Sequence, residues 1–389
     1  MKLFFCTSSY PAKSKISIGS LGSFQRDWVL QLIKHGIEVF VITPAQPGDD
    51  FDETEENLHI IRYEWAGSKK GAELSSLNIF NPKDLYFAFS IFWKGTWAVL
   101  KLAKKERPDF TFALWAVPCG FFAWICKKIY KTPYAVWTLG SDIWVYGRKF
   151  YTRPLLKTIL KSADKLYSDG FLLGEETGKL GGQKCDFLPS TQKLTTQNLE
   201  KVELPYIDGK INFLFIGRYH HNKGPDVLLE AINILPKEIG EKCHFHMFGG
   251  GDLEPKLREQ IQEYDLKNVT LNGFVNTTEC SALLRSAHFF IVPSREDSIP
   301  VILSDGLQCF LPVIAAQVGD MTKLLNDYKV GYSFPKEDVK MLAQCIQKAV
   351  KDDKQSFKPE IDRILNIFDI SKAVDTLAAD IQSLIKHER

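Results

Sequence analysis

Two basic residues stand five positions apart on one short segment of the chain. Arg218 and Lys223 follow the apolar run 211–216, and Gly217 separates the run from the arginine. A guanidinium grips phosphate oxygens in a fixed fork, whereas an ammonium acts as a mobile point charge. The pair therefore suits a leaving diphosphate, whose negative charge grows during reaction. An ordinary basic surface loop is the alternative for this segment taken alone.

A run of three glycines, 249–251, follows a second apolar run and precedes a helical pattern. Glycine lets the backbone pass close to another group and aim amide donors at it. A simple strand-to-helix turn is the alternative, because three glycines by themselves are a weak signal. The Gly-Phe-Val turn 273–275 closes another short strand. We expect its backbone to face a flat base.

Two aspartates flank the start of a predicted helix. Pro300 suits a first helical turn, so Asp297 is expected on the preceding loop and Asp305 more than a turn inside the helix. A carboxylate accepts hydrogen bonds from two vicinal sugar hydroxyls, and free amides near Ser298 and Ile299 favour phosphate. A helix cap is the alternative role for Asp297.

Alternating strands and helices must position these groups. Strand 2–6, helix 21–34 and strand 38–43 form a β-α-β unit and hence a parallel sheet. A second series of the same kind begins at residue 211. The sequence thus predicts an α/β chain with two Rossmann-like, doubly wound domains that face each other across a cleft. The predicted parts are an N-terminal domain (1–188), a polar linker (189–209), a C-terminal domain (210–368) and a C-terminal helix (369–389) that packs back toward the N-terminal domain.

The composition is that of a soluble globular protein. With 389 residues, 45% hydrophobic and 25% charged, the chain is too long for one core, and its net charge of +2 favours no class of partner. Its eight cysteines are scattered and mostly apolar in context, which predicts reduced core residues and a cytoplasmic protein. The longest apolar stretches, 85–100 and 111–126, fall short of a membrane-spanning helix. The apolar residues 3–6 at the start of the sequence are too few for the apolar region of a signal peptide.

The chain resembles the retaining GT-B glycosyltransferases called glycosyl transferases group 1. That family has a Gly-Arg loop with Lys-Gly five residues on, a glycine turn, a Pro-Ser loop whose two glutamates are separated by seven residues, and a Gly-x-Pro-Val-Ile-Ala segment. The family's two glutamates fall on Asp297 and Asp305, and its helix glycine falls on Phe310. The matching segments are 217–224, 249–251, 293–305 and 311–315.

The N-terminal half resembles the family more loosely. Gly19-Ser20 matches its Gly-Gly turn, which approaches the donor phosphate. The segment 138–142 is similar to its Thr-x-His-Gly-Ser-Asp segment, with leucine in place of histidine, so that Gly140 to Asp142 act through backbone and carboxylate. Trp115, in a Trp-x-x-Pro-x-Gly segment, stacks on a sugar in this interpretation; a core tryptophan is the alternative.

This resemblance implies a metal-independent, retaining, hexosyltransferase-type enzyme that needs no cofactor and uses a nucleotide-diphosphate sugar as donor. Arg218 and Lys223 would stabilise the leaving diphosphate, Asp297 would hold sugar hydroxyls and Asp305 the ribose. The N-terminal domain would bind a glycan or lipid-linked acceptor for cell-envelope polysaccharide or glycolipid synthesis. The implied catalytic residues are Arg218, Lys223 and Asp142. The implied donor-binding residues are Gly19, Ser20, Gly217, Gly249, Gly250, Phe274, Asp297, Ser298, Ile299 and Asp305. The implied acceptor residues are Trp115, Gly140 and Ser141.

No metal site is predicted. Asp50-Phe51-Asp52 matches an Asp-x-Asp metal motif, but it belongs to an acidic loop, 49–56. His244 and His246 share one face of a strand without a third ligand, which favours core or edge residues.

Basic residues outnumber acidic ones between positions 127 and 165, where nine lysines and arginines meet only Asp142 and Asp164. With the aromatic residues of segment 80–93, this bias predicts contact with the inner face of an anionic membrane. A solvated helix face is the alternative. Nothing indicates a nucleic-acid partner.

Two other classes share these features. A GT-B sugar-nucleotide epimerase or a phosphorylase would turn over without an acceptor, and a binding protein with a degenerate donor site would not turn over. The alternative of a binding protein rests on the two shortened acids and the missing histidine. A nicotinamide dehydrogenase is disfavoured, because Gly19 and Gly22 lack the Gly-x-Gly-x-x-Gly spacing.

Overall fold

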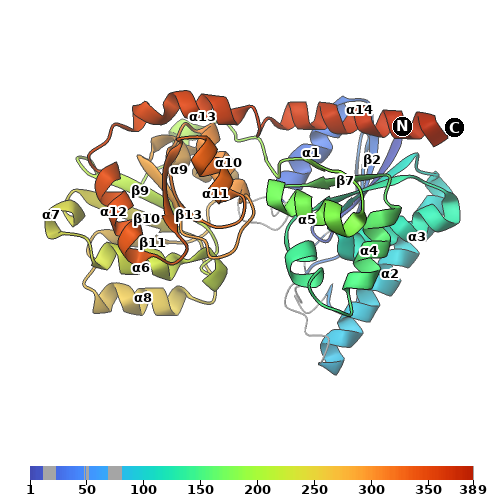
Figure 1. Cartoon of the computed structure of the whole chain (residues 1–389), viewed down its shortest axis with the longest axis horizontal. Coiled ribbons are helices and arrows are strands. Elements are labelled where there is room, and N and C mark those ends of the chain that lie inside the picture. Colours follow the sequence, from blue (N-terminus) through green and yellow to red (C-terminus); the bar gives the residue numbers. More distant parts are fainter. Residues whose placement is uncertain (12–22, 48, 50–51, 69–80, 389) are drawn as a thin grey trace. The chain divides into compact units, whose positions relative to one another are not determined.

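The computed structural model describes residues 1–11, 23–47, 49, 52–68 and 81–388 (Figure 1). The chain divides into two compact units. Unit 1 includes Gln25–Pro189 and the C-terminal Ile370–Arg389, and unit 2 includes Ser190–Asp369.

Unit 1 contains a mainly parallel sheet. Its described residues form eight strands in the order β3-β4-β2-β1-β5-β6-β7-β8, and only the edge pair β3 and β4 is antiparallel. Strands β5 and β6 are buried along their whole length, as expected where helices cover both faces. The strands are β1 (Lys2–Cys6), β2 (Glu38–Pro44), β3 (Asp52–Glu55), β4 (Leu58–Tyr63), β5 (Phe110–Leu114), β6 (Tyr134–Thr138), β7 (Lys165–Ser168) and β8 (Cys185–Phe187).

Helices connect these strands. The longest, α2, begins after Asn81, whose side chain accepts a hydrogen bond from the Lys83 amide, with Pro82 in the first turn. The helices of unit 1 are α1 (Ser23–Lys34), α2 (Pro82–Glu106), α3 (Phe121–Tyr130), α4 (Arg153–Ser162), α5 (Phe171–Gly181) and α14 (Ile370–Glu388), with the short turns η4 (Ala116–Gly120) and η5 (Asp142–Tyr146).

The last helix, α14, belongs to unit 1 although residues of unit 2 precede it. Asp380 accepts a hydrogen bond of 2.6 Å from the Tyr167 hydroxyl, and its Oδ2 lies 3.3 Å from the Lys165 ammonium. Near the end of α1, His35 lies 3.1 Å from Asp375, and Figure 1 shows the two helices side by side. Polar contacts therefore tie this helix to β7 and α1.

Unit 2 contains a parallel sheet. Within its described residues, six strands run in the order β11-β10-β9-β12-β13-β14. This is the doubly wound order 3-2-1-4-5-6 when the strands are counted along the chain. They are β9 (Ile211–Ile216), β10 (Cys243–Phe248), β11 (Val269–Asn272), β12 (Phe289–Val292), β13 (Val313–Gln317) and β14 (Gly331–Pro335).

Helices alternate with these strands. They are α6 (Pro225–Asn233), α7 (Lys237–Gly240), α8 (Glu254–Glu263), α9 (Thr277–Ser286), α10 (Val301–Gln308), α11 (Met321–Asp327), α12 (Val339–Ala349) and α13 (Lys358–Leu365), with η6 (Leu199–Lys201), η7 (His221–Lys223) and η8 (Lys354–Phe357). The prediction of an α/β chain with two Rossmann-like domains is confirmed.

Some local predictions differ from the structure. The acidic segment 49–56, which was expected to be a loop, contains the edge strand β3. The strand was not predicted because a short polar strand has no apolar pattern in the sequence. Pro300 precedes α10 instead of lying in its first turn. Part of the expected linker lies against unit 2, where the Tyr206 hydroxyl donates to the carbonyl of Leu283 at 2.6 Å. Among the described helices, none is long and apolar enough to cross a membrane.

Candidate active site

The strand order of unit 2 reverses beside β9, which has β10 on one side and β12 on the other. Open parallel sheets bind ligands outside the carboxyl ends of their strands at such a point. The loops 217–224 and 293–300 begin at the ends of β9 and β12. The predicted cationic loop and the first carboxylate therefore meet where this fold binds its ligands.

Lys223 and Asp297 join these two loops. The Lys223 Nζ lies 2.8 Å from each carboxylate oxygen of Asp297, and the side chains are only 24% and 16% exposed. Asp297 does not cap a helix, because α10 begins at Val301 without a side-chain cap. The helix-cap alternative for Asp297 is therefore wrong.

Gly224 allows this approach of the loops. Its φ of 66° lies in the left-handed region, and a Cβ at this position would lie 2.1 Å from the carbonyl oxygen of Pro293. No other residue type fits there without moving one of the two loops.

Arg218 is exposed on the same loop. Its guanidinium forms no hydrogen bond or ion pair with any part of the chain that the structure describes. Its donors therefore face solvent, where a ligand can reach them.

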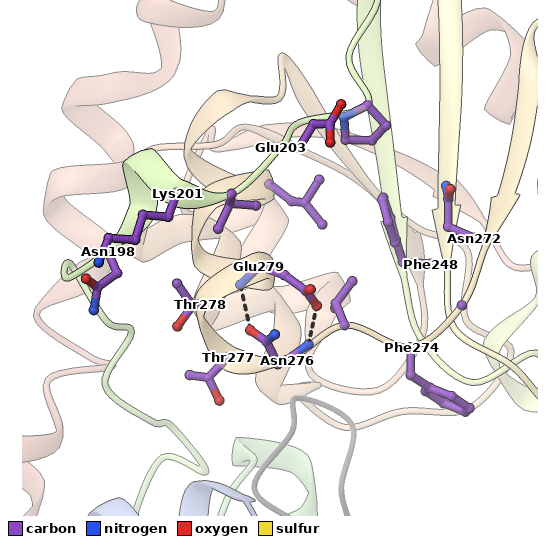
Figure 2. Close-up of a pocket in the computed structure, with 15 residues that line it drawn as sticks. Asn198, Lys201, Glu203, Phe248, Asn272, Phe274, Asn276, Thr277, Thr278 and Glu279 are labelled. Atoms are coloured by element: carbon purple, nitrogen blue, oxygen red, sulfur yellow. Dashed lines mark hydrogen bonds between the residues drawn. The ribbon is translucent and has the colours of Figure 1, made fainter.

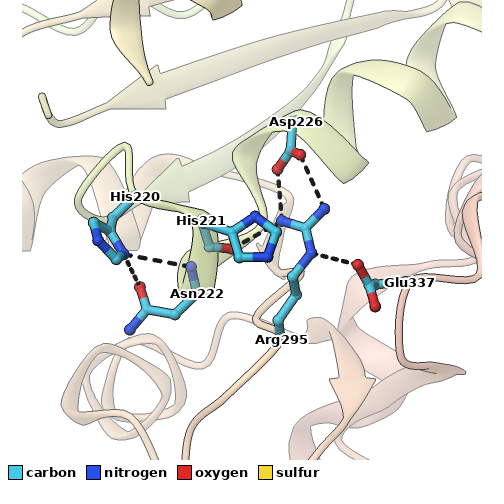
Figure 3. Close-up of polar contacts among 6 residues, drawn as sticks. All are labelled: His220, His221, Asn222, Asp226, Arg295 and Glu337. Carbon is cyan, nitrogen blue, oxygen red and sulfur yellow. Dashed lines mark hydrogen bonds and ion pairs between the residues drawn. The ribbon is translucent and has the colours of Figure 1, made fainter. Parts of the chain in front are cut away.

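A second arginine, which the sequence did not single out, fixes the geometry of the two loops (Figure 3). Arg295 donates two hydrogen bonds to Asp226, of 2.8 and 2.9 Å, and a third of 2.8 Å to the carbonyl of His221. Its Nε donates to Glu337 at 2.6 Å. Figure 3 shows the guanidinium between the two carboxylates, with His220 and Asn222 hydrogen-bonded to each other on the neighbouring turn.

The charges in this cluster support each other. Burial acts to raise the pKa of Asp226, but the hydrogen bonds and charge of Arg295 outweigh it, so that this pKa lies below its ordinary value. The hydrogen bonds to Asp226 and Glu337 raise the pKa of Arg295 despite its burial. The residues come from three separate parts of the chain, and no spacing in the sequence indicates that they meet.

Asp305 lies inside α10 and is 1% exposed. Its Oδ2 accepts a hydrogen bond of 2.7 Å from Gln192. Two residues of the loop before α10 are also buried. The Ser298 hydroxyl donates a hydrogen bond of 3.2 Å to Asp320, and Ile299 is 5% exposed. Asp305 and Ser298 of the predicted donor site are therefore hydrogen-bonded to other side chains of the protein.

The glycine turn packs against both the cationic loop and the turn after β11. A Cβ on Gly249 would lie 1.9 Å from the carbonyl oxygen of Gly217, and one on Gly250 would lie 2.8 Å from the ring of Phe274. Gly217, Gly249, Gly250 and Phe274 are therefore brought together. The Phe274 ring itself is 63% exposed.

A pocket of about 720 Å³ opens beside this turn (Figure 2). Segment 272–279 lines one side, and residues around η6 line the other. Figure 2 shows the start of α9 within its wall, where Asn276 and Glu279 exchange hydrogen bonds of 2.7 and 2.9 Å in a capping box. The volume is in the range of small-molecule sites.

In unit 1, Asp142 is 0% exposed. It accepts hydrogen bonds from the amides of Ala116, at 2.9 Å, and Leu139, at 3.3 Å. Burial raises its pKa to about 6, against the backbone hydrogen bonds, which lower it. Asp142 thus joins the two predicted acceptor segments, and its burial favours a positioning role over contact with a substrate.

The acceptor candidates surround this contact. Trp115 is half-buried and has a φ of 64°, a conformation that costs a large residue about 1–3 kcal/mol. Gly140 has a φ of 108°, and Ser141 is exposed. Strained residues of this kind cluster at functional sites.

Other candidates lie elsewhere. Gly19 and Ser20 lie outside the described residues, as does Asp50 of the metal motif. In the described ranges, no group of three histidine, cysteine, aspartate or glutamate residues is placed to hold a metal ion. His246 is buried and hydrogen-bonded to Asn212 at 2.9 Å, which matches its interpretation as a core residue.

The sequence is similar to two described families. Residues 197–360 match "Glycosyl transferases group 1", and residues 22–170 match "Glycosyl transferase 4-like". The putative teichuronic acid biosynthesis glycosyltransferase TuaC of Bacillus subtilis is 25% identical over 99% of both chains. The O-antigen chain mannosyltransferase C of Escherichia coli is 28% identical over 66% of this chain and 70% of that protein.

Solved structures show the same fold. Sucrose-phosphate synthase from Thermosynechococcus elongatus superposes with a TM-score of 0.78 at 18% identity, covering 99% of both chains. Anabaena HepE in complex with UDP-glucose gives a TM-score of 0.72 at 14% identity, covering 98% of this chain and 100% of that one. These are GT-B structures.

Proposed function

We propose that this chain, which belongs to the glycosyl transferases group 1 family of GT-B glycosyltransferases, transfers a sugar from a nucleotide-diphosphate donor with retention of the anomeric configuration. We further propose a glycan or lipid-linked acceptor in cell-envelope polysaccharide or glycolipid synthesis. The names of the relatives, which include teichuronic acid and O-antigen enzymes, support this setting. The ion pair between Lys223 and Asp297 at the switch point of unit 2 is the observation that carries the proposal.

In this mechanism the donor diphosphate binds between Arg218 and Lys223. Lys223 is already held by Asp297, and Arg218 is exposed to solvent. When the diphosphate attracts the Lys223 ammonium, the carboxylate of Asp297 becomes available for the hydroxyls of the donor sugar. Both cations then stabilise the charge that develops on the leaving group, as a metal ion does in other transferases.

Retention follows if the acceptor attacks the same face that the diphosphate leaves. A leaving phosphate oxygen takes the proton of the acceptor hydroxyl, so no side chain has to act as nucleophile. The sugar bond to the diphosphate breaks as the bond to the acceptor oxygen forms. The protein contributes orientation and charge stabilisation.

The nucleoside would extend toward Phe274 and the pocket beside it. This turn packs directly on Gly250, so a diphosphate at the cationic loop and a base at segment 273–275 are within one continuous surface of unit 2. For Asp305 to hold the ribose, its hydrogen bond to Gln192 must rearrange when the donor binds.

A membrane contact of unit 1 forms part of this proposal. On α2, four aromatic side chains are between 59% and 65% exposed: Tyr86, Phe89, Trp93 and Trp97. Their spacing of three or four residues places them on one helix face, whereas Phe87 and Ile91 are buried. We propose that this aromatic face rests on the cytoplasmic side of an anionic membrane, together with basic residues of segment 127–165.

Thermal-shift measurements with UDP, GDP, ADP and dTDP and their sugar conjugates test the donor site, because a ligand of the native state raises the melting temperature. We expect one nucleotide to stabilise the protein and Arg218→Ala to abolish that shift. The anomeric configuration of the product, read by NMR, tests retention. Turnover of the donor without an acceptor would favour an epimerase or phosphorylase, and no binding of any nucleotide would contradict the proposal.

A further inference from the structure

A second pocket, of about 310 Å³, lies within unit 1. Three parts of the chain line it: η5 with the turn that follows it, the first half of α4, and the second half of α5. Its polar lining residues are Arg148, Arg153, Lys157, Glu176 and Lys179.

The pocket carries a surplus of positive charge. Four cations line it, and Glu176 is the one carboxylate among the lining residues. Arg148, Arg153 and Lys157 are exposed, and within the described chain their side chains form no hydrogen bond or ion pair. Cations that converge on a concave surface focus a positive potential, which an anion relieves.

Other basic residues of the same stretch are engaged elsewhere. Lys127 lies 2.5 Å from Asp164, and Lys165 lies 2.7 Å from Asp186. The ammonium of Lys149 lies 5.3 Å from the centre of the Tyr146 ring. The basic residues of segment 127–165 therefore do not form one uniform solvated face: Arg148, Arg153 and Lys157 gather at the pocket, whereas Lys128, Lys131 and Lys161 do not line it.

The start of α4 adds to this charge. This ten-residue helix has no side-chain cap and no acidic residue in its first turn. Its dipole thus adds partial positive charge beside Arg153. Two apolar side chains are exposed in the segment before α4: Val145 of η5 is 48% exposed, and Phe150 is 85% exposed.

The pocket also follows the candidate acceptor segment without a break. Asp142, which binds the amides of Leu139 and Ala116, is followed directly by Ile143, a lining residue of the pocket. One lining residue of the pocket thus follows Gly140, Ser141 and Asp142 directly in the sequence.

We propose that this pocket binds the phosphate or diphosphate group of the acceptor, with Arg153 and Lys157 as its main ligands. The exposed Phe150 and Val145 contact an apolar chain attached to that group. The identity of the ligand as an acceptor rests on the proposed function, whereas the binding of a phosphate group does not.

The experiment starts from the full chain carrying Arg218→Ala and Lys223→Ala, so that phosphate groups cannot bind to the donor loop. Calorimetry then measures the affinity for inorganic phosphate, inorganic pyrophosphate and farnesyl diphosphate, and sedimentation measures binding to phosphatidylglycerol vesicles. The pocket variant adds Arg153→Gln and Lys157→Gln. The matched control adds Lys161→Gln, an exposed lysine one turn further along α4 that does not line the pocket.

We expect pyrophosphate or farnesyl diphosphate to bind at least tenfold more weakly to the pocket variant and equally well to the control. Tighter binding of farnesyl diphosphate than of pyrophosphate identifies a lipid-linked diphosphate. A pocket-dependent loss for vesicles alone identifies a lipid headgroup as the phosphate source. Circular dichroism confirms that each variant is folded.

Equal affinities of pocket variant and control for every probe, or no binding of any probe, would overturn the proposal. The pocket variant made in the otherwise unchanged chain should keep its nucleotide-induced thermal shift. A failure of nucleotide binding with retained pocket binding would count against the proposed function alone.

Discussion

The Lys223 and Asp297 side chains form a largely enclosed ion pair between two loops. Each charge depends on the other for compensation, and the loss of either leaves an unpaired charge in a partly desolvated position. The ion pair thus holds the Lys223 ammonium in a fixed orientation at the place where we expect the donor diphosphate to bind.

Substitution of Lys223 tests this role directly. We expect Lys223→Ala to lower kcat by about 100-fold to 1000-fold, because a preorganised group that stabilises developing charge is lost. The melting temperature should change much less. Lys237→Ala is the matched control, since its side chain is 90% exposed on the same unit. Unchanged turnover in Lys223→Ala would remove the diphosphate assignment.

Arg295 acts on the same loops through other residues. Its side chain is 9% exposed and binds Asp226 and Glu337, so Arg295→Ala leaves a buried carboxylate unpaired. We expect a loss of about 3–5 kcal/mol in the free energy of unfolding, measured with urea. Arg258→Ala breaks an exposed pair with Glu254 on α8 and should cost about 0–1 kcal/mol. Similar losses in the two variants would show that Arg295 is an ordinary surface residue.

At the scale of the elements, β10 carries a histidine whose protonation opposes folding. Burial, together with nearby His244, lowers the pKa of His246 to about 4. Below pH 6.5 the unfolded chain takes up a proton here that the folded chain binds only near pH 4, so the free energy of unfolding falls as the pH drops.

We therefore expect His246→Gln to lose less stability than the unchanged chain between pH 7.5 and pH 5. Urea unfolding at the two pH values measures the difference. The difference between the two proteins in the free energy of unfolding at pH 7.5 gives the packing cost of the substitution, which is subtracted from the difference at pH 5. An identical pH dependence in both proteins would mean that His246 titrates normally in the folded state.

The exposed face of α2 makes its own prediction. Trp93→Ala with Trp97→Ala removes two large interfacial side chains that are 64% and 59% exposed. Binding to phosphatidylglycerol vesicles should fall at least tenfold in sedimentation, with little change in melting temperature. Ile234→Ala, an exposed apolar residue of unit 2, serves as the control. Retained binding in the double variant would place any membrane contact elsewhere.

At the scale of the whole molecule, the chain leaves unit 1 at Pro189, builds unit 2, and returns with α14. This helix buries Val374, Leu377 and Ile381, which are at most 1% exposed. Unit 1 therefore includes a helix with a buried apolar face that follows unit 2 in the sequence.

Leu377→Ala should accordingly lower the free energy of unfolding by about 2–5 kcal/mol, the usual cost of a cavity in a core. Thr376→Ala, at an exposed neighbouring position, should have almost no effect. Urea unfolding of both variants makes the comparison. Equal stability of the two would indicate that α14 is not part of the cooperative unit.

The sequence by itself determined the α/β class, the two Rossmann-like units and the family. The reason is that strands, helices and turns depend on local signals, such as the apolar run before Gly217 and the glycine turn 249–251. The strands β3, β4, β8 and β14 were not predicted. Three of them, β3, β8 and β14, are edge strands, which need no continuous apolar run.

Only the tertiary structure decided which side chains meet. The partners Lys223 and Asp297 are 74 positions apart, Asp226 and Arg295 are 69 apart, and Gln192 and Asp305 are 113 apart. Contacts of this kind arise because parallel strands bring distant loops to one sheet edge, so no local spacing encodes them. The burial of Asp142, which is predicted as a catalytic carboxylate, was decided by the tertiary packing as well.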